Sequence, residues 1–158
     1  MHSATVARAG RRLSLLSLLT VVLATVAAAN LAMIYLLFVV DQPGISIAGF
    51  VPIIAIGAVP FLVTAFLLAW VIRSQGRSEP GQLPRQVIGR LRMVSGIGLP
   101  FMILGGLWSG LGAAFLGLEQ GTAAGYALTL YQFTFLAAVI ADGITLVVSL
   151  TTRPASLP

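Results

Sequence analysis

The sequence has no cysteine and no lysine, and 8% of its 158 residues are charged. Without cysteine, the protein forms no disulfide and offers no thiolate nucleophile or cysteine-ligated metal. The single histidine, His2, stands at the N-terminus, so histidine-ligated metals and bis-histidine haem lack a ligand pair. A glycine-rich phosphate loop and a Ser/His/Asp set are also missing from the sequence. We therefore predict that the chain is not an enzyme and binds no cofactor and no metal.

What the sequence does contain is mostly apolar. Hydrophobic residues make up 58% of the chain, and the charged fraction falls well below the ~25% of an ordinary soluble domain. A soluble protein of this length would need a charged surface to stay in solution. The composition therefore predicts an integral membrane protein.

Four long apolar segments lie at residues 13–40, 47–72, 93–118 and 122–152. Each is longer than the roughly 20 residues that cross the hydrocarbon core of a bilayer. Because backbone groups find no water in that core, each segment should be a helix. We predict one membrane domain over residues 1–158, an all-α, antiparallel up-down bundle of four transmembrane helices. Tight turns connect the helices of each hairpin, and a polar loop at 73–92, in which Pro84 could start a short amphipathic helix, joins the hairpins.

All nine basic residues are arginines, and all fall on one side of the predicted bundle. Three precede the first helix, one follows the fourth, and the tight turns carry none. The loop holds the other five, Arg73, Arg77, Arg85, Arg90 and Arg92. By the positive-inside rule this side is cytoplasmic, which predicts a plasma-membrane protein with both termini inside the cell. We expect the loop arginines to set the topology and to contact anionic lipid headgroups, not nucleic acid.

The two predicted hairpins resemble each other. Arg12-Leu13 precedes Asp41-Gln42 by 29 positions, and Arg90-Leu91 precedes Glu119-Gln120 by the same number. This spacing predicts a parallel repeat of two hairpins, unless shared turn chemistry and arginine placement alone produce it.

Small and polar residues within the apolar segments indicate how the helices would pack. The third segment contains Gly106-x-x-x-Gly110 followed by Ala113, a pattern that lets membrane helices approach closely. Asn30 in the first segment is expected to form a hydrogen bond to another helix. These positions predict a compact bundle with small residues at the helix contacts.

Asp142 is the one acidic residue within an apolar segment. It lies eleven residues before Arg153, which places it roughly 16 Å from the cytoplasmic side, near the middle of the bilayer. An aspartate at that depth costs about 3 kcal/mol on insertion scales, so we expect it to face the bundle. Thr134, Thr145 and Ser149 recur on the same helical face and could donate hydrogen bonds to it. With no basic residue inside any apolar segment, desolvation favours the protonated carboxyl.

Several short stretches occur in an order that is similar to a known family. They are "AAN" (28–30), "FVVDQP" (38–43), Trp70, "RSQGRSEP" (73–80), "LWSGLGAAFLGL" (107–118) and "RPASLP" (153–158). In this order they resemble the N-terminal membrane module of actinobacterial membrane-anchored class III adenylate cyclases. The family carries a Glu-Arg pair before its Arg-Pro, where this sequence reads "SLTTRP", and the sequence holds neither a HAMP nor a cyclase domain. The resemblance implies a module of a bacterial plasma membrane without catalytic residues of its own.

Two functions of different classes stay open at this point. The chain can be a membrane sensor or anchor module of a signalling system, whose fourth helix passes a shift or rotation to a downstream signalling protein. Alternatively, it is a subunit of a small oligomeric transporter or channel, or an assembly factor, with Asp142 in a proton or cation path. Asp142 itself is either a neutral packing residue, a contact between subunits, or a group that responds to protons or cations.

Overall fold

The computed structural model describes residues 2–42, 44–74, 85–116 and 122–152. These residues form four α-helices, α1 (His2–Asp41), α2 (Val51–Ser74), α3 (Arg85–Phe115) and α4 (Ala123–Thr151), and a short 3-10 helix, η1 (Ile47–Gly49). The predicted all-helical fold, with four helices long and apolar enough to cross a membrane, is confirmed. The candidate spans are Gly10–Asp41, Val51–Ser74, Gln86–Ala113 and Ala123–Thr151.

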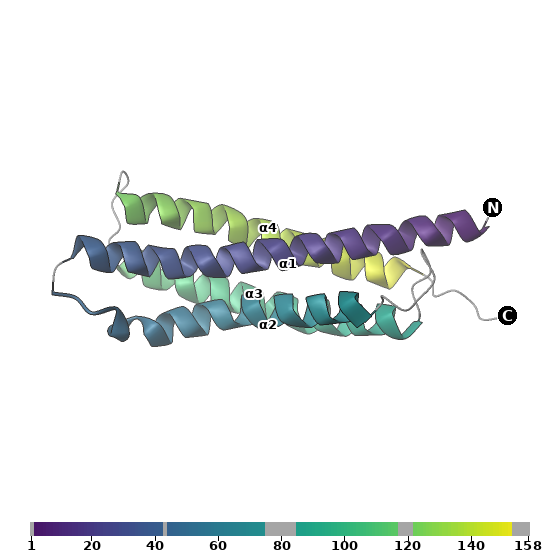
Figure 1. The fold of residues 1–158 in the computed structure, drawn as a ribbon, viewed down its shortest axis with the longest axis horizontal. Helices are drawn as coiled ribbons and strands as arrows, with labels where there is room; N and C mark the ends of the chain where they lie inside the picture. Colours follow the sequence, from purple (N-terminus) through teal and green to yellow (C-terminus); the bar gives the residue numbers. More distant parts are fainter. Residues whose placement is uncertain (1, 43, 75–84, 117–121, 153–158) are drawn as a thin grey trace.

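The four helices lie side by side along the long axis of the molecule (Figure 1). α1 packs against α2 and α4, and α3 packs against the same two helices, so that the bundle is a closed ring of neighbours in which α1 and α4 share the largest contact. The start of α1 and the end of α4 lie at one end of the bundle, on the right in Figure 1. The end of α2 and the start of α3 lie there too, and we call this the basic end because Arg73, Arg90 and Arg92 belong to it.

The predicted polar loop at 73–92 is too long, because α3 begins at Arg85 and not at Met93. Val87, Ile88 and Leu91 are buried, whereas Gln86 and Arg90 are exposed. The first turns of α3 are therefore amphipathic, and packing of their apolar side extends the helix beyond its continuously apolar part. Pro84, where a separate short helix was predicted, lies outside the described residues.

The second helix begins at Val51, four residues later than predicted, because residues 47–49 form η1. The Ser46 hydroxyl accepts a hydrogen bond from the Ala48 N–H at 3.3 Å and caps this short helix. Gly44 precedes it with φ of 101°, a backbone conformation that favours glycine. Local contacts thus shape residues 44–50 of the connection between α1 and α2.

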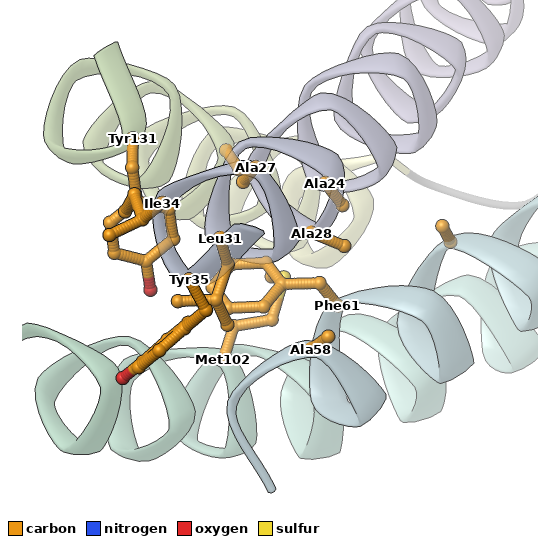
Figure 2. Packing of buried hydrophobic residues seen from close by; sticks show 12 residues of the cluster. Ala24, Ala27, Ala28, Leu31, Ile34, Tyr35, Ala58, Phe61, Met102 and Tyr131 are labelled. Atoms are coloured by element: carbon orange, nitrogen blue, oxygen red, sulfur yellow. The ribbon is translucent and has the colours of Figure 1, made fainter. Parts of the chain in front are cut away.

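The larger apolar core fills the half of the bundle away from the basic end. Figure 2 shows side chains from all four helices gathered in it, among them Leu31, Tyr35, Phe61, Met102 and Tyr131. Phe135 stacks on Tyr131 and meets Phe61 edge-on, with ring centroids 6.1 and 6.0 Å apart. This half of the bundle is consequently filled mainly by apolar side chains, with Ser109 and the hydroxyl groups of Tyr35 and Tyr131 buried among them.

A smaller apolar cluster lies near the basic end. Its buried members are Leu13, Leu68, Val71, Val87, Ile88 and Leu91, which come from α1, α2 and α3. The polar residues inside the bundle lie between these two clusters or beside them.

Glycines bring the helices close together, but not in the predicted pair. A Cβ at Gly106 of α3 would collide with the ring of Phe135 of α4, so a close contact at this residue is observed. A Cβ at Gly110 would meet nothing within 4 Å among the described residues, so Gly110 makes no close helix contact there. Ala113 is fully buried. The Gly106-x-x-x-Gly110 pattern is therefore not used as a unit among the described residues, since only Gly106 lies against a side chain of α4.

Candidate functional site

Asp142 lies in the interior of the bundle, with 0% of its surface exposed. The Ser95 side chain of α3 lies beside its carboxyl group. Within the described part of the chain, the two carboxyl oxygens of Asp142 have no hydrogen-bond partner at acceptable geometry. The same is true of the Ser95 hydroxyl group. Because the carboxyl group does not reach the outer surface of the bundle, a contact between subunits through Asp142, one of the roles left open by the sequence, is wrong for this arrangement.

Buried hydroxyl groups continue from Asp142 toward the basic end. Thr145 of α4 and Thr20 of α1 face each other with their hydroxyl oxygens 3.5 Å apart. Ser149 lies one turn beyond Thr145 on α4, and Ser17 lies three residues before Thr20 on α1. Both serines are fully buried. Together these residues form a polar interior face that runs along α4 and α1.

The predicted hydrogen bonds from this face to Asp142 are not formed, because the hydroxyl protons are used elsewhere. Thr145 donates to the Ala141 carbonyl at 2.8 Å, and Ser149 donates to the Leu146 carbonyl at 2.7 Å. A serine or threonine hydroxyl carries a single proton, so a group that donates to its own helix has none left for a carboxyl group. Thr134, the third predicted donor, gives its proton to the Leu130 and Tyr131 carbonyls.

Asn30 forms its predicted type of contact, a hydrogen bond between helices. Its Nδ2 atom donates to the Thr134 Oγ1 atom of α4 at 3.2 Å. Both residues are half-buried and lie on the side of Asp142 that is away from the basic end. The bond therefore helps to hold α1 against α4, but Asn30 and Thr134 are not part of the polar face that includes Thr145 and Ser149.

Arg92 joins the start of α3 to the end of α4. Its Nε and Nη2 atoms donate to the Ser149 carbonyl at 2.8 and 2.6 Å, and Nη2 also reaches the Thr152 carbonyl at 3.2 Å. The last carbonyls of a helix have no partner within the helix and carry partial negative charge. A guanidinium group satisfies several of them at once, so Arg92 acts as a C-terminal cap supplied by another helix.

The remaining loop arginines have different surroundings. Arg90 places its Cζ atom 5.3 Å from the ring centroid of Trp70 at the end of α2, in a cation–π contact. Arg73 is exposed in the last turn of α2. Arg77 and the side chain of Arg85 lie outside the described residues. Of the five arginines predicted to contact lipid, Arg92 is thus directed mainly at protein carbonyls.

Sequence reasoning missed Ser95, Thr20 and Ser17 as neighbours of the Asp142 region. The signal available was the three- and four-residue spacing of Leu13, Ser17 and Thr20, which places them on one helical face. This spacing is a weak signal, because serine and threonine side chains that form hydrogen bonds to their own helix occur on any helical face. Whether the face with Ser17 and Thr20 is buried depends on how α1 is rotated against α4.

Among the described residues, no group of three His, Cys, Asp or Glu side chains could hold a metal ion. Comparison with known proteins gives no significant match to a protein-family model, to a curated protein or to a solved structure.

Proposed function

We propose that the chain is a non-catalytic, multi-pass protein of a bacterial plasma membrane that serves as a sensor or anchor module of a signalling system. In this proposal the helices form an antiparallel up-down bundle with the basic end and both termini in the cytoplasm, as the positive-inside rule favours. The resemblance of the sequence to the membrane module of class III adenylate cyclases supports the same role.

The observation that carries the proposal is the contact between Arg92 and the end of α4. The last carbonyls of α4 depend on a side chain of α3, so any displacement between these helices alters the end of α4. Shifts of about 1–2 Å between packed helices are a known means of transmitting signals. α4 would thus pass a change in the bundle to a downstream signalling protein at the basic end.

The alternative, a transporter or channel subunit, is favoured by one observation, the buried carboxyl of Asp142. The polar interior face extends from this residue toward the basic end, whereas the apolar core fills most of the other half of the bundle, where Ser109 and the hydroxyl groups of Tyr35 and Tyr131 are also buried. A proton or cation crossing the bilayer along this chain would have to pass Leu31, Phe61 and Met102, which are fully buried. The interior is therefore better suited to a packed module than to a conduction path.

A chimera tests the signalling role. The chain is fused to the catalytic domain of a class III adenylate cyclase that has lost its own membrane module, and cyclase activity is measured in membranes. We expect Arg92→Gln to change the activity at least severalfold, and Arg11→Gln, which alters an exposed arginine of α1, to leave it unchanged. Equal activity of the parent chimera, both variants and a fusion to an unrelated membrane anchor would refute the sensor role and the coupling through α4, and would leave the chain as an anchor only.

Proton flux tests the alternative. We expect proteoliposomes with an imposed pH gradient to lose it no faster than protein-free liposomes. A faster loss that Asp142→Asn abolishes would replace the present proposal with a transport function, whereas a faster loss that persists in Asp142→Asn would indicate leakage through damaged bilayers.

A further inference from the structure

α2 and α3 enclose an apolar groove on the outer surface of the bundle. The part nearer the basic end has a volume of 290 Å³, and the part further from it has a volume of 660 Å³. Both parts include Val59, Pro60 and Phe101, so that they form one continuous groove. Their sizes are close to the ~300–1,000 Å³ of small-molecule sites.

Glycines on α3 set the depth of this groove. A Cβ at Gly98 would lie 2.7 Å from the Thr64 side chain, and a Cβ at Gly105 would lie 2.9 Å from Pro60 Cγ. The two helices therefore meet closely along the floor of the groove, while larger exposed side chains such as Val63 and Phe101 form its walls.

The groove ends at the contact between Trp70 and Arg90. On α2 its wall passes through Val63 and Leu67, and Trp70 follows Leu67 by three residues on the same face. On α3 its wall passes through Met93, and Arg90 precedes Met93 by three residues. The guanidinium group and the indole thus stand where the groove opens at the basic end, with Arg90 held over Trp70.

The depth of the groove matches one leaflet of a bilayer. Phe101 lies eleven residues beyond Arg90, a distance of about 16 Å along α3, which is close to half of the ~30 Å hydrocarbon core. Indole rings are enriched at the headgroup level of membranes, where Trp70 would lie if Arg90 stands at the cytoplasmic surface. The part of the groove with 290 Å³ would then occupy the cytoplasmic leaflet.

The lining of this part suits a hydrocarbon chain. Its walls are aliphatic and aromatic side chains, among them Leu67, Met93, Ile97 and Phe101. Between Met93 and Phe101 the groove is about 12 Å long, a length that an acyl chain lying along the helices can fill. The positive charge of Arg90 at its mouth favours an anionic lipid over a second copy of this chain, which has a formal net charge of +5.

From these observations we infer that the groove between α2 and α3 binds one anionic phospholipid of the cytoplasmic leaflet. An acyl chain lies between Val63 and Ile97, and the phosphate and headgroup contact Arg90, with Arg73 one turn beyond Trp70 on α2 as a second positive charge. The inference requires the basic end to be cytoplasmic, but it does not depend on a signalling role.

Tryptophan fluorescence provides a direct test, because the chain has only two tryptophans: Trp108 lines the groove, and Trp70 follows its wall on α2 and contacts Arg90. In the variant Trp108→Phe the remaining indole, Trp70, reports on the mouth of the groove. The protein is reconstituted in two kinds of phosphatidylcholine bilayer. One contains a low mole fraction of phosphatidylglycerol with brominated acyl chains, and the other contains the same fraction of phosphatidylcholine with brominated acyl chains. We expect the brominated anionic lipid to quench Trp70 more strongly than brominated phosphatidylcholine does, by an amount that corresponds to about fivefold higher occupancy of the groove. One arginine near the membrane surface supplies a preference of this size for an anionic lipid.

Two variants and their matched controls locate the effect. Arg90→Gln should abolish the preference for the anionic lipid, whereas Arg11→Gln, at an exposed arginine of α1, should retain it. Ile97→Phe, which fills the groove, should lower quenching by the brominated anionic lipid to the phosphatidylcholine level. Ile140→Phe, at an exposed position of α4 that does not line the groove, should leave quenching unchanged.

Three results would overturn the inference. Equal quenching by the two brominated lipids would show ordinary contact with bulk lipid. A preference that survives Arg90→Gln would place the anionic lipid elsewhere. Quenching that falls as the ratio of protein to lipid rises would show that a second copy of the chain covers the groove.

Discussion

Asp142 shows how a costly residue can be kept inside an apolar bundle. Its carboxyl group is fully buried beside Ser95, and its potential donors on α4, Thr145 and Ser149, donate to main-chain carbonyls. A buried polar group without a partner costs about 1–3 kcal/mol. Asp142 therefore lowers the free energy of unfolding of the bundle in this arrangement. Packing alone gives no reason for an aspartate at this position.

We expect Asp142→Asn to raise the free energy of unfolding in detergent micelles by about 1 kcal/mol, because the amide is neutral and brings two N–H donors within reach of Ser95. Asp41→Asn, at an exposed acid beyond the apolar core, serves as the control and should change stability little. Thermal or denaturant unfolding followed by circular dichroism measures both. A clear loss of stability in Asp142→Asn would mean that the carboxylate holds a partner that compensates for its burial.

Gly106 and Gly110 provide a matched pair of substitutions one turn apart. A Cβ at Gly106 would collide with Phe135, whose ring is held against Tyr131 and Phe61. We expect Gly106→Ala to destabilise the protein by about 1–3 kcal/mol, the usual cost of overpacking. Among the described residues nothing lies within 4 Å of a Cβ at Gly110, so Gly110→Ala should be neutral or stabilising by up to about 1 kcal/mol, since alanine favours the helix. The same unfolding measurement checks this pair, and equal effects would contradict the observed difference in space at the two glycines.

At the level of elements, one side chain, Arg92 of α3, holds the start of α3 against the end of α4. Hydrogen bonds to a charged group contribute about 1.5–3 kcal/mol, and Arg92 donates two short ones to the Ser149 carbonyl. The last carbonyls of a helix have no donor within the helix, so a donor from another helix stabilises the end of α4. The contact thus makes the first turns of α3 part of the folded bundle and not a free loop.

We expect Arg92→Gln to destabilise the protein by about 2 kcal/mol and to increase hydrogen exchange in the last turns of α4. Arg11→Gln, which removes an exposed arginine at the same end, should do neither. Hydrogen–deuterium exchange with mass spectrometry distinguishes a local effect from a general loss of stability. Protection at the end of α4 that is unchanged in Arg92→Gln would show that this contact does not hold the helix end.

The same region shows which parts of the structure could be predicted from the sequence. Hydropathy alone located four helices, because length and apolar composition decide whether a segment can span a bilayer. It misplaced the start of α3, since Val87, Ile88 and Leu91 are spaced among polar residues and belong to an amphipathic helix.

The interior of the bundle could be predicted only in part. The burial of Asp142 follows from the cost of exposing it to lipid. Its neighbour Ser95 and the facing pair of Thr20 and Thr145 depend on the rotation of each helix about its axis, which is set by packing at residues such as Gly106. Lipid-facing and protein-facing surfaces are both apolar here, so hydropathy does not reveal that rotation.

At the level of the whole molecule, the polar interior closes within a single chain. α1, α2, α3 and α4 form a ring of contacts, and Asp142, Thr145 and Ser149 are all fully buried in it. The outer surface carries large exposed apolar side chains on all four helices, as expected where lipid replaces water around a bundle. The predicted parallel repeat of hairpins stays a prediction.

The absence of cysteine allows the proposed orientation to be tested by single cysteines. Gln42, next to the end of α1, and Ser74, at the end of α2, are both exposed, and α2 has a length of about 36 Å, enough to cross the ~30 Å core. We expect Gln42→Cys to react with a membrane-impermeant maleimide in intact spheroplasts, and Ser74→Cys to react only after the membrane is opened. The reverse pattern would place the arginines outside and contradict the positive-inside assignment. Reaction of both residues in sealed spheroplasts would show that α2 does not span the bilayer, and both the lipid site and the coupling through α4 would then lose their physical basis.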